Sequence, residues 1–202
     1  MIVARIITGI IILILLFLLF FYMPYISLNL FFILLLLYIL RFEWPQFKQP
    51  QLTIFYPVVP FCALILLNTY HRDYLLLLFT SLFIHDSCAY AIGKLWGRHK
   101  IAPHISPGKT WEGFLGATGI SCGVTKFLFS DYSIFLILAL NICALAGDLF
   151  ESWLKRKVHL KDSGTLLPGH GGILDRFDSI MFGAFFLIII TFFQYYGSII
   201  KL

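Results

Sequence analysis

The stretch IITGIIILILLFLLFFYMPYISLNLFFILLLLYIL, residues 6–40, contains no charged side chain. A helix that crosses a lipid bilayer needs about 20 consecutive apolar residues, so this stretch is long enough for two such helices. Pro24 is the expected break between them, because proline lacks an N–H group and disfavours helix in the residue before it. The stretch therefore predicts a helical membrane protein.

The composition of the whole chain leads to the same conclusion. Of its 202 residues, 60% are hydrophobic and 12% are charged, and the mean hydropathy is +0.91. Apolar residues make up about 45 to 50% of a typical soluble domain, so this class is excluded. The predicted fold is all-α, a polytopic integral membrane helical bundle that forms a single domain over residues 1–202.

About seven transmembrane helices are expected, near residues 2–22, 25–40, 52–70, 74–93, 113–129, 132–150 and 179–200. Pro57 and Pro60 predict a kink in the third helix. The fifth is rich in small residues that let another helix approach closely, namely Gly113, Gly116, Gly119 and Gly123. Residues 1–80 carry little beyond hydrophobicity, whereas residues 81–180 carry the motifs that could support catalysis.

Lysine and arginine are unevenly distributed between the two predicted membrane faces. With seven helices and a cytoplasmic N-terminus, twelve of the fifteen Lys and Arg residues lie on the cytoplasmic side. Arg72, Lys126 and Lys201 lie on the other side, and the positive-inside rule favours this orientation. We therefore expect a multi-pass protein of the cell (inner) membrane whose long polar loops, residues 94–112 and 151–178, face the cytoplasm.

Acidic residues gather near that same face, although carboxylates within membrane helices are costly and usually functional. Asp86 is expected in the cytoplasmic half of the fourth helix, while Asp148 and Glu151, like Asp175 and Asp178, are spaced i, i+3 on one helical face. Structural ion pairs with Lys or Arg would explain the grouping, and a helix cap would explain Asp178 alone. The sharper hypothesis is a hard cation such as Mg²⁺, which prefers oxygen ligands.

Two short glycine-containing segments carry the features of an anion site. HISPGKTWEG, residues 104–113, leads into the fifth helix, and PGHGG, residues 168–172, leads toward the seventh. Free backbone N–H groups, a helix N-terminus and a nearby lysine together favour phosphate, although neither segment is a Walker motif. Each could also be an ordinary interfacial turn that faces anionic lipid headgroups. Carboxylates that could bind a metal ion and N–H groups that could bind phosphate are thus expected on the same cytoplasmic face. This combination favours a metal-assisted displacement reaction at phosphorus.

The run SWLKRKVHLKDSGTLLPGHGGILDRFD, residues 152–178, resembles the signature of the phosphatidate cytidylyltransferase family, the CDP-diacylglycerol synthases. The segment at residues 85–113, HDSCAYAIGKLWGRHKIAPHISPGKTWEG, resembles the second block of that family, and GDLFES, residues 147–152, resembles the third. The resemblance covers more than half of the chain and includes every motif expected to bear chemistry.

The resemblance implies that CTP and phosphatidic acid react to give CDP-diacylglycerol and pyrophosphate, with Mg²⁺ as cofactor and a second metal ion left open. It implies a catalytic set of Asp148, Asp175, Asp178 and Lys161, in which the three aspartates bind metal, with Asp86 and Glu151 as additional or supporting ligands. Side-chain cations and backbone N–H groups would bind substrate phosphates at Ser106, Lys109, Lys155, Arg156, His170, Gly171, Gly172 and Arg176. The resemblance also suggests a homodimer.

Two other function classes are considered. A CTP-dependent polyprenol or lipid kinase would use similar groups but transfer the terminal phosphoryl, and the long signature argues against it. An ion-coupled transporter would place its acids near the bilayer midplane within inverted repeats, whereas these acids lie at one face beside basic loops. The expected partners are therefore CTP, phosphatidic acid and the lipid bilayer, with no nucleic acid.

Overall fold

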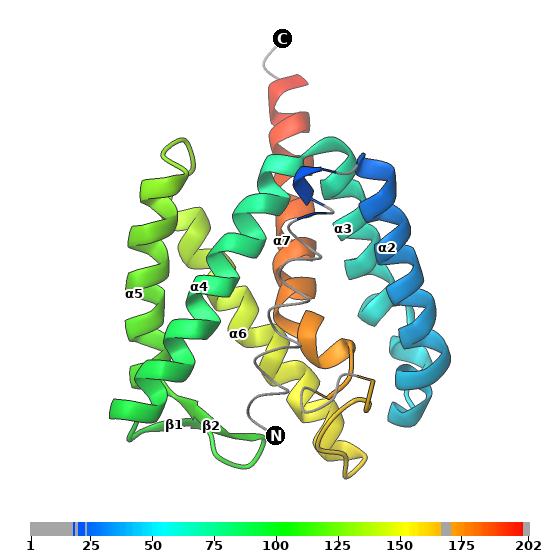
Figure 1. The fold of residues 1–202 in the computed structure, drawn as a ribbon, viewed down its shortest axis with the longest axis vertical. Helices are drawn as coiled ribbons and strands as arrows, with labels where there is room; N and C mark the ends of the chain where they lie inside the picture. The colour runs from blue at the N-terminus through cyan, green and yellow to red at the C-terminus, as the bar shows by residue number, and fades with distance from the viewer. Residues whose placement is uncertain (1–17, 19, 23, 167–170, 200–202) are drawn as a thin grey trace.

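The computed structural model describes residues 18, 20–22, 24–166 and 171–199, and it is mainly helical (Figure 1). The helices are α2 (Tyr25–Tyr38), α3 (Val59–Tyr70), α4 (Arg72–Trp96), α5 (Trp111–Leu128), α6 (Ile134–Lys157) and α7 (Leu174–Ile199). Short π and 3₁₀ turns join α2 to α3, namely η1 (Ile39–Glu43), η2 (Trp44–Phe47), η3 (Pro50–Leu52) and η4 (Ile54–Val58). The strands β1 (Lys100–Ala102) and β2 (Ser106–Thr110) form an antiparallel hairpin between α4 and α5.

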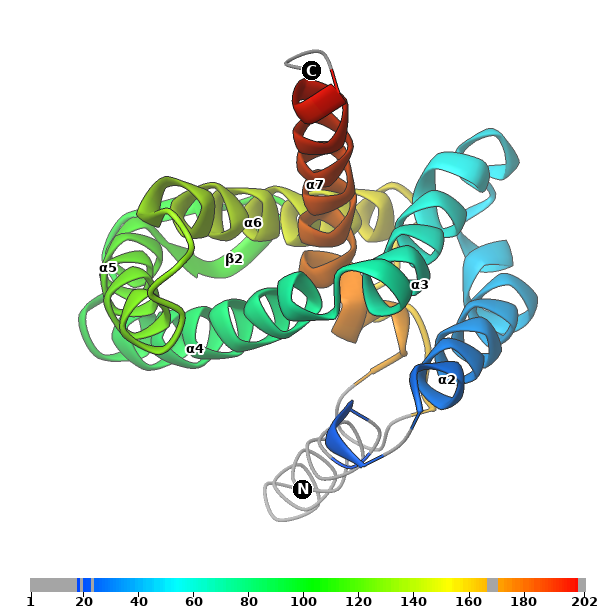
Figure 2. The same cartoon turned by 90° about the horizontal axis from the view of Figure 1, so that it is seen from above.

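Helix α7 lies between two groups of helices, with α4, α5 and α6 on one side and α2 and α3 on the other (Figure 2). It packs against both α3 and α6. The C-terminal ends of α4 and α6, the hairpin and the N-terminal end of α7 lie at the same end of the bundle, the lower end in Figure 1. This end is called the hairpin end below, and it carries the two polar loops.

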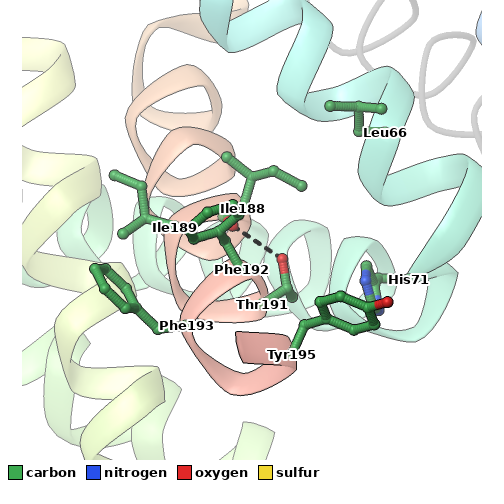
Figure 3. A pocket seen from close by; sticks show the side chains of 8 residues that line it. All are labelled: Leu66, His71, Ile188, Ile189, Thr191, Phe192, Phe193 and Tyr195. Atoms are coloured by element: carbon green, nitrogen blue, oxygen red, sulfur yellow. Dashed lines mark hydrogen bonds between the residues drawn. The ribbon is translucent and has the colours of Figure 1, made fainter. Parts of the chain in front are cut away.

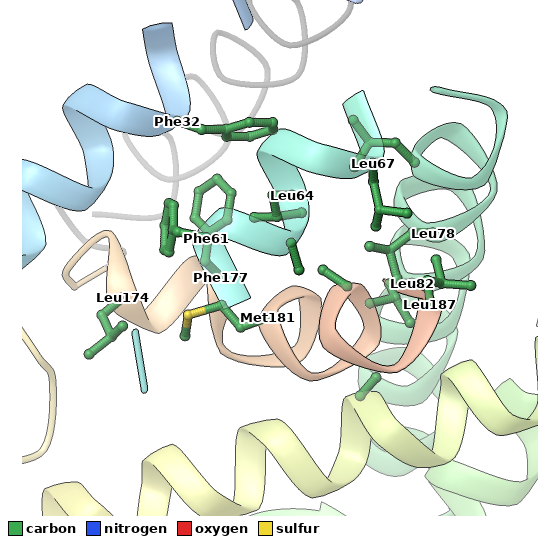
Figure 4. Close-up of a cluster of buried hydrophobic side chains, with 14 of the residues drawn as sticks. Phe32, Phe61, Leu64, Leu67, Leu78, Leu82, Leu174, Phe177, Met181 and Leu187 are labelled. Atoms are coloured by element: carbon green, nitrogen blue, oxygen red, sulfur yellow. The ribbon is translucent and has the colours of Figure 1, made fainter. Parts of the chain in front are cut away.

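The apolar core lies where α2, α3 and α4 meet α7 (Figure 4). Phe32, Phe61 and Leu64 contribute from α2 and α3, and Phe177 and Met181 contribute from α7. Inside a bilayer the lipid tails are as apolar as these side chains, so close van der Waals packing, more than escape from water, stabilises the cluster. The outward faces are also apolar, and Phe127 on α5 is 86% exposed, as expected for side chains that face lipid.

Five described helical segments are long and apolar enough to cross a membrane: Tyr25–Phe47, Pro50–Tyr70, Arg72–Trp96, Ile134–Lys157 and Leu174–Tyr195. The prediction of a helical membrane protein is confirmed, but the prediction of about seven spanning helices is not. The expected first helix falls almost entirely outside the described residues. Helix α5 forms near its predicted position but is not among the five. Its buried face is partly polar and includes Thr118, Ser121 and Thr125.

That polar face of α5 belongs to a buried seam between α4, α5 and α6. Ser81 of α4 and Ser121 of α5 lie 3.2 Å apart at their Oγ atoms, and the Ser81 hydroxyl donates to Asn141 Oδ1 of α6 at 3.2 Å. Ser121 also donates to the backbone carbonyl of Ser81 at 3.0 Å. All three side chains are fully shielded, so the seam satisfies polar groups that lipid could not.

The glycines of α5 differ from one another in what they contact. A Cβ atom at Gly113 would lie 2.8 Å from the carbonyl oxygen of Ala89, and one at Gly116 would lie 2.9 Å from Ile92 Cδ1. Close approach of another helix, α4, is therefore confirmed for these two. Gly119 and Gly123 have no such neighbour within 4 Å in the described part of the chain.

Several predicted boundaries need correction. The loop before the fifth helix contains the β hairpin, so the fold is not purely α-helical. Helix α6 continues to Lys157, and α7 begins at Leu174 and not near residue 179. The kink predicted in the third helix is confirmed, since Tyr56 has non-helical φ and ψ angles of −154° and 107° before α3 begins.

Candidate active site

A polar cavity of about 770 Å³ opens at the hairpin end of the bundle. Residues of α4, β2, α6 and α7 line it, including Asp86, Lys109, Asp148 and Asp178. A second recess, of about 510 Å³, lies near the C-terminal half of α7 and is lined mainly by apolar side chains such as Ile188 (Figure 3). Seven of the residues predicted from the sequence therefore line the polar cavity, namely Asp86, Lys109, Asp148, Lys155, Asp175, Arg176 and Asp178. Glu151 is not part of this lining.

Helices α6 and α7 meet closely at Gly147, which sets the acidic side of the cavity. A Cβ atom at this position would lie 2.5 Å from the backbone oxygen of Asp178 and 3.1 Å from Phe182 Cβ. Because Gly147 has no side chain, the first turns of α7 pack directly against the turn of α6 that carries Asp148 and Glu151. Their carboxylates are then close enough to Asp178 to interact electrostatically with it.

The hairpin supplies a cation to this acidic side. Lys109 of β2 forms an ion pair with Asp148 of α6, and both side chains are partly buried. The next residue, Thr110, ends the strand and caps α5, where its Oγ1 accepts the N–H of Gly113 at 3.2 Å. The hairpin thus fixes Lys109 across the cavity from α7 while it starts α5.

Asp175, in the first turn of α7, has partners at both carboxylate oxygens. Lys155 of α6 donates to Oδ1 at 2.6 Å, and the N–H groups of Ser163 and Gly172 donate to Oδ2 at 2.8 Å each. Gly171, with φ of +81°, adopts a left-handed conformation that favours glycine, and a Cβ there would lie 2.5 Å from Asp175 Oδ2. Asp175 therefore anchors the loop before α7 as well as lining the cavity.

Glu151 has few partners for a fully buried carboxylate. It is 0% exposed, its Oε1 lies 3.4 Å from Lys155 Nζ, and neither oxygen accepts a hydrogen bond within the part of the chain that the structure describes. A buried carboxylate without such donors is costly, and a cation offsets this cost. The donor set of Asp148, Glu151 and Asp178 thus fits Mg²⁺ in its chemistry, although no three His, Cys, Asp or Glu side chains among the described residues are already gathered as a metal site.

Asp86 lies at the rim of the cavity. Its side chain is 61% exposed, and its Oδ1 lies 3.4 Å from Nδ1 of the buried neighbour His85. The other ring nitrogen of His85 lies 3.3 Å from Thr118 Oγ1 of α5. Asp86 is thus brought to the cavity but stands farther into solvent than the carboxylates of α6 and α7.

The predicted phosphate-binding residues divide into two sets. Lys109, Lys155 and Arg176 line the cavity, and Gly171 and Gly172 border Asp175. Among the described residues, Ser106, Arg156 and Lys161 are not part of the cavity lining. Arg156 instead donates to the carbonyl oxygens of Ile105 at 3.2 Å and Leu160 at 2.9 Å, which ties α6 to the hairpin. His170 lies outside the described residues.

Glu112 holds the outer edge of the hairpin at the start of α5, outside the five candidate spans. Its carboxylate bonds the ring of His99 and accepts the N–H of Arg98 at 3.1 Å and of His99 at 3.2 Å. These hydrogen bonds, that of the His99 ring above all, lower the pKa of Glu112 to about 2.

Sequence reasoning missed Glu43, which is almost fully buried beside the start of α7. Its signal was present, because it is the first acidic residue after a long charge-free stretch and lies between Phe42 and Trp44. A carboxylate among aromatic residues at the end of a membrane helix calls for a buried partner. No periodicity, however, indicates that this partner lies more than a hundred residues later.

The fold and the cavity define a class, a helical membrane protein with a pocket of mixed charge at one end of its spans. The sequence profile of the cytidylyltransferase family matches residues 49–194. Since this is more than half of the chain, the protein belongs to the cytidylyltransferase family.

Individual curated relatives are also similar to this chain. This chain is 41% identical over 152 residues to the phosphatidate cytidylyltransferase of Staphylococcus saprophyticus. The match covers 70% of this chain and 58% of that protein. It is 47% identical over 119 residues to the phosphatidate cytidylyltransferase of Staphylococcus haemolyticus, and 44% identical over 119 residues to that of Staphylococcus aureus. Each of these two matches covers 54% of this chain and 45% of the relative, so the chain spans about half the length of these relatives.

Proposed function

We propose that this protein transfers the cytidylyl group of CTP to phosphatidic acid, which gives CDP-diacylglycerol and pyrophosphate. The names of its relatives support the substrates, and the cavity supports the chemistry. The observation that carries the proposal is the meeting of Lys109 from the hairpin with Asp148 of α6, close to the carboxylates of Glu151 and Asp178. Cations for phosphate and oxygens for metal then share one cavity.

The reaction asks for positioning and charge neutralisation more than for covalent help from the protein. A phosphate oxygen of phosphatidic acid attacks the α-phosphorus of CTP, and the bond to the departing pyrophosphate breaks. Phosphatidic acid is already an anion, so no nucleophilic side chain is needed. Lys109 and Arg176 would bind the phosphates, because both line the cavity and carry positive charge.

Mg²⁺ is the proposed cofactor, and a second ion would fit the same mechanism. Asp148, Asp178 and Glu151 would hold it, with Asp86 at the rim. The metal would neutralise phosphate charge as pyrophosphate leaves. Asp175 also stays a predicted ligand, although in this structure both of its oxygens already accept hydrogen bonds from Lys155 and two backbone N–H groups.

The proposed site faces the cytoplasm from the cell (inner) membrane. The described residues that the sequence places on the opposite face, Arg72 and Lys126, belong to the far ends of α4 and α5 (Figure 1). The acyl chains of the lipid would remain in the bilayer while its headgroup meets CTP at the hairpin end. The homodimer suggested by sequence resemblance remains a prediction.

The proposal is tested with purified protein, phosphatidic acid vesicles, Mg²⁺ and CTP labelled in both the cytidine and the γ-phosphate. The expected result is labelled cytidine in the lipid fraction and labelled pyrophosphate in solution. A lipid that carries the γ-phosphate, with CDP in solution, would instead identify a lipid kinase. No transfer, together with ion uptake into vesicles that contain the protein, would identify a transporter.

A further inference from the structure

Glu43 connects the first described helical region to the start of α7. It ends the π-helical turn η1 and is 1% exposed. Its Oε1 accepts the N–H of Ile173 at 2.8 Å, and its Oε2 accepts the N–H of Leu174 at 2.8 Å. The hydroxyl of Ser163 also donates to Oε2, at 3.2 Å, so three donors from a distant segment converge on one carboxylate.

The contacts around Glu43 leave room only for glycine at two positions. A Cβ atom at Gly164 would lie 2.9 Å from Glu43 Oε1. A Cβ atom at Gly172 would lie 2.7 Å from the same oxygen and 2.3 Å from Ser163 Oγ. The two ends of the segment 163–172 thus approach the carboxylate closely, and both ends use a glycine to do so.

The partners of Glu43 are the groups that a helix start leaves unsatisfied. The first N–H groups of a helix have no acceptor within the helix, and its N-terminal end carries partial positive charge. Within the described residues, no Lys or Arg side chain forms an ion pair with Glu43, so N–H and hydroxyl donors alone stabilise its carboxylate. Glu43 therefore caps α7 from a distant part of the chain.

The same segment ends also hold Asp175. Ser163 donates its hydroxyl to Glu43 and its backbone N–H to Asp175. Gly172 donates its N–H to Asp175, while the next two residues donate theirs to Glu43. Consecutive amides are thus divided between two carboxylates, so a change at Glu43 would shift the turn that carries Asp175 and Asp178.

We propose that Glu43 is a positioning residue, which fixes the first turn of α7 so that Asp175 and Asp178 face α6 in register. Only the expected effect of Glu43 on enzymatic turnover rests on the proposed function. Its effect on the segment itself is measurable without either substrate. Glu43 lies before residues 49–194, the part of the chain that the family profile matches.

The test compares Glu43→Gln with Trp44→Phe in the full chain. Glutamine keeps the size of Glu43 but replaces one acceptor oxygen with an NH₂ group that faces a donor. Trp44→Phe is the matched control, because it removes a partly buried hydrogen bond of 2.7 Å, from Trp44 Nε1 to Thr53 Oγ1, in the residue next to Glu43. Neither partner of this bond belongs to the segment 163–174. Ser163→Ala is the milder companion variant, since it removes only the hydroxyl donor.

Two quantities are measured, hydrogen exchange over residues 163–176 without substrate and steady-state cytidylyl transfer. We expect Glu43→Gln to speed amide exchange at residues 172–174 by about tenfold. The loss of one typical hydrogen bond to a charged group changes the opening equilibrium by about this factor. We expect kcat to fall about tenfold to a hundredfold with KM for CTP within about twofold, because small misplacements reduce turnover more than binding. Ser163→Ala should change both in the same direction but less, and Trp44→Phe should change neither.

The proposal is overturned if exchange at residues 172–174 stays at the wild-type rate in Glu43→Gln. It is also overturned if exchange rises equally in α2, α3 and α6, because Glu43 would then support overall stability and not the site. If wild-type protein transfers no cytidylyl group, the proposed function fails, while local acceleration of exchange would still support the role of Glu43 in holding α7. The two failures are therefore distinguishable.

Discussion

On the α7 side of the cavity, Asp175 accepts hydrogen bonds at both oxygens from Lys155, Ser163 and Gly172. On the hairpin side, the partner that the structure shows for Asp148 is one flexible side chain, that of Lys109. Backbone donors cannot leave without moving the chain, whereas a lysine side chain can rotate away at little cost. The same residue type, aspartate, thus anchors the fold on one side of the cavity and remains available to ligands on the other.

Asp175→Asn is expected to have the largest effect, a loss of both stability and activity. The substitution leaves Lys155 without its closest partner and weakens two backbone hydrogen bonds. Removing one member of a buried ion pair typically costs about 3–5 kcal/mol. We expect the unfolding midpoint in detergent to fall clearly, together with activity. Asp162→Asn, at an exposed acid on the same loop, is the control and should leave the midpoint near wild type.

Asp148→Asn should separate activity from stability. We expect cytidylyl transfer to fall about 10²–10³-fold, the range for loss of one preorganised electrostatic contact in an active site. The unfolding midpoint should stay close to wild type, because Asp148 has no backbone donor to lose among the described residues. Asp131→Asn, in the loop at the far end of the bundle, should retain full activity. A large fall in the midpoint for Asp148→Asn would erase the distinction between the two sides of the cavity.

A smaller effect is expected at Thr110, which joins the hairpin to α5. Thr110→Val keeps the shape of the side chain but removes the cap on the N–H of Gly113. Loss of such a cap costs about 1 kcal/mol. Thermal unfolding should therefore show a modest decrease for Thr110→Val and recovery in Thr110→Ser, which restores the oxygen. Equal losses in both variants would show that the threonine methyl group, and not the cap, stabilises this junction.

The smallest expected effect is a pH-dependent change in local stability where Glu112 holds Arg98 and His99 at the edge of the hairpin. Folding lowers the pKa of Glu112 from an ordinary 4.5 to about 2, so its stabilising contribution is complete above 4.5 and is lost as pH falls toward 2. We expect amide exchange at Arg98 and His99 to be slower in wild type than in Glu112→Gln above pH 4.5. The difference should shrink as pH falls from 4.5 and disappear only below pH 2. A constant ratio of exchange rates across this range would contradict the assignment to Glu112.

Periodicity and hydrophobicity predicted the helical membrane class, the approximate positions of the described helices and the break before α3. They did not predict that α7 starts at Leu174, because the cap on this start is Glu43 and its contact is long-range. They also did not predict the hairpin, since its strands are short and polar and their pairing depends on the ends of α4 and α5. Local sequence patterns do not encode either contact.

The candidate site was predictable in composition but not in its division of roles. The spacing of Asp148 and Glu151, and of Asp175 and Asp178, indicated shared helical faces. It could not indicate that Gly147 lets α7 approach or that Arg156 turns away to the hairpin. The sequence also gave no reason to separate Asp175 from Asp148, because the difference arises from backbone N–H groups that meet only in the folded chain.

The polar seam between α4, α5 and α6 also bears on how the protein reaches its membrane. Alone in lipid, α5 would leave the hydroxyl of Ser121 without partners from other helices, which is costly. Beside α4 and α6, Ser121 has Ser81 and Asn141 as partners. We therefore expect α5 to partition into the bilayer together with α4 and not as an independent segment. A glycosylation-site insertion assay on α5, with and without α4, would measure this dependence.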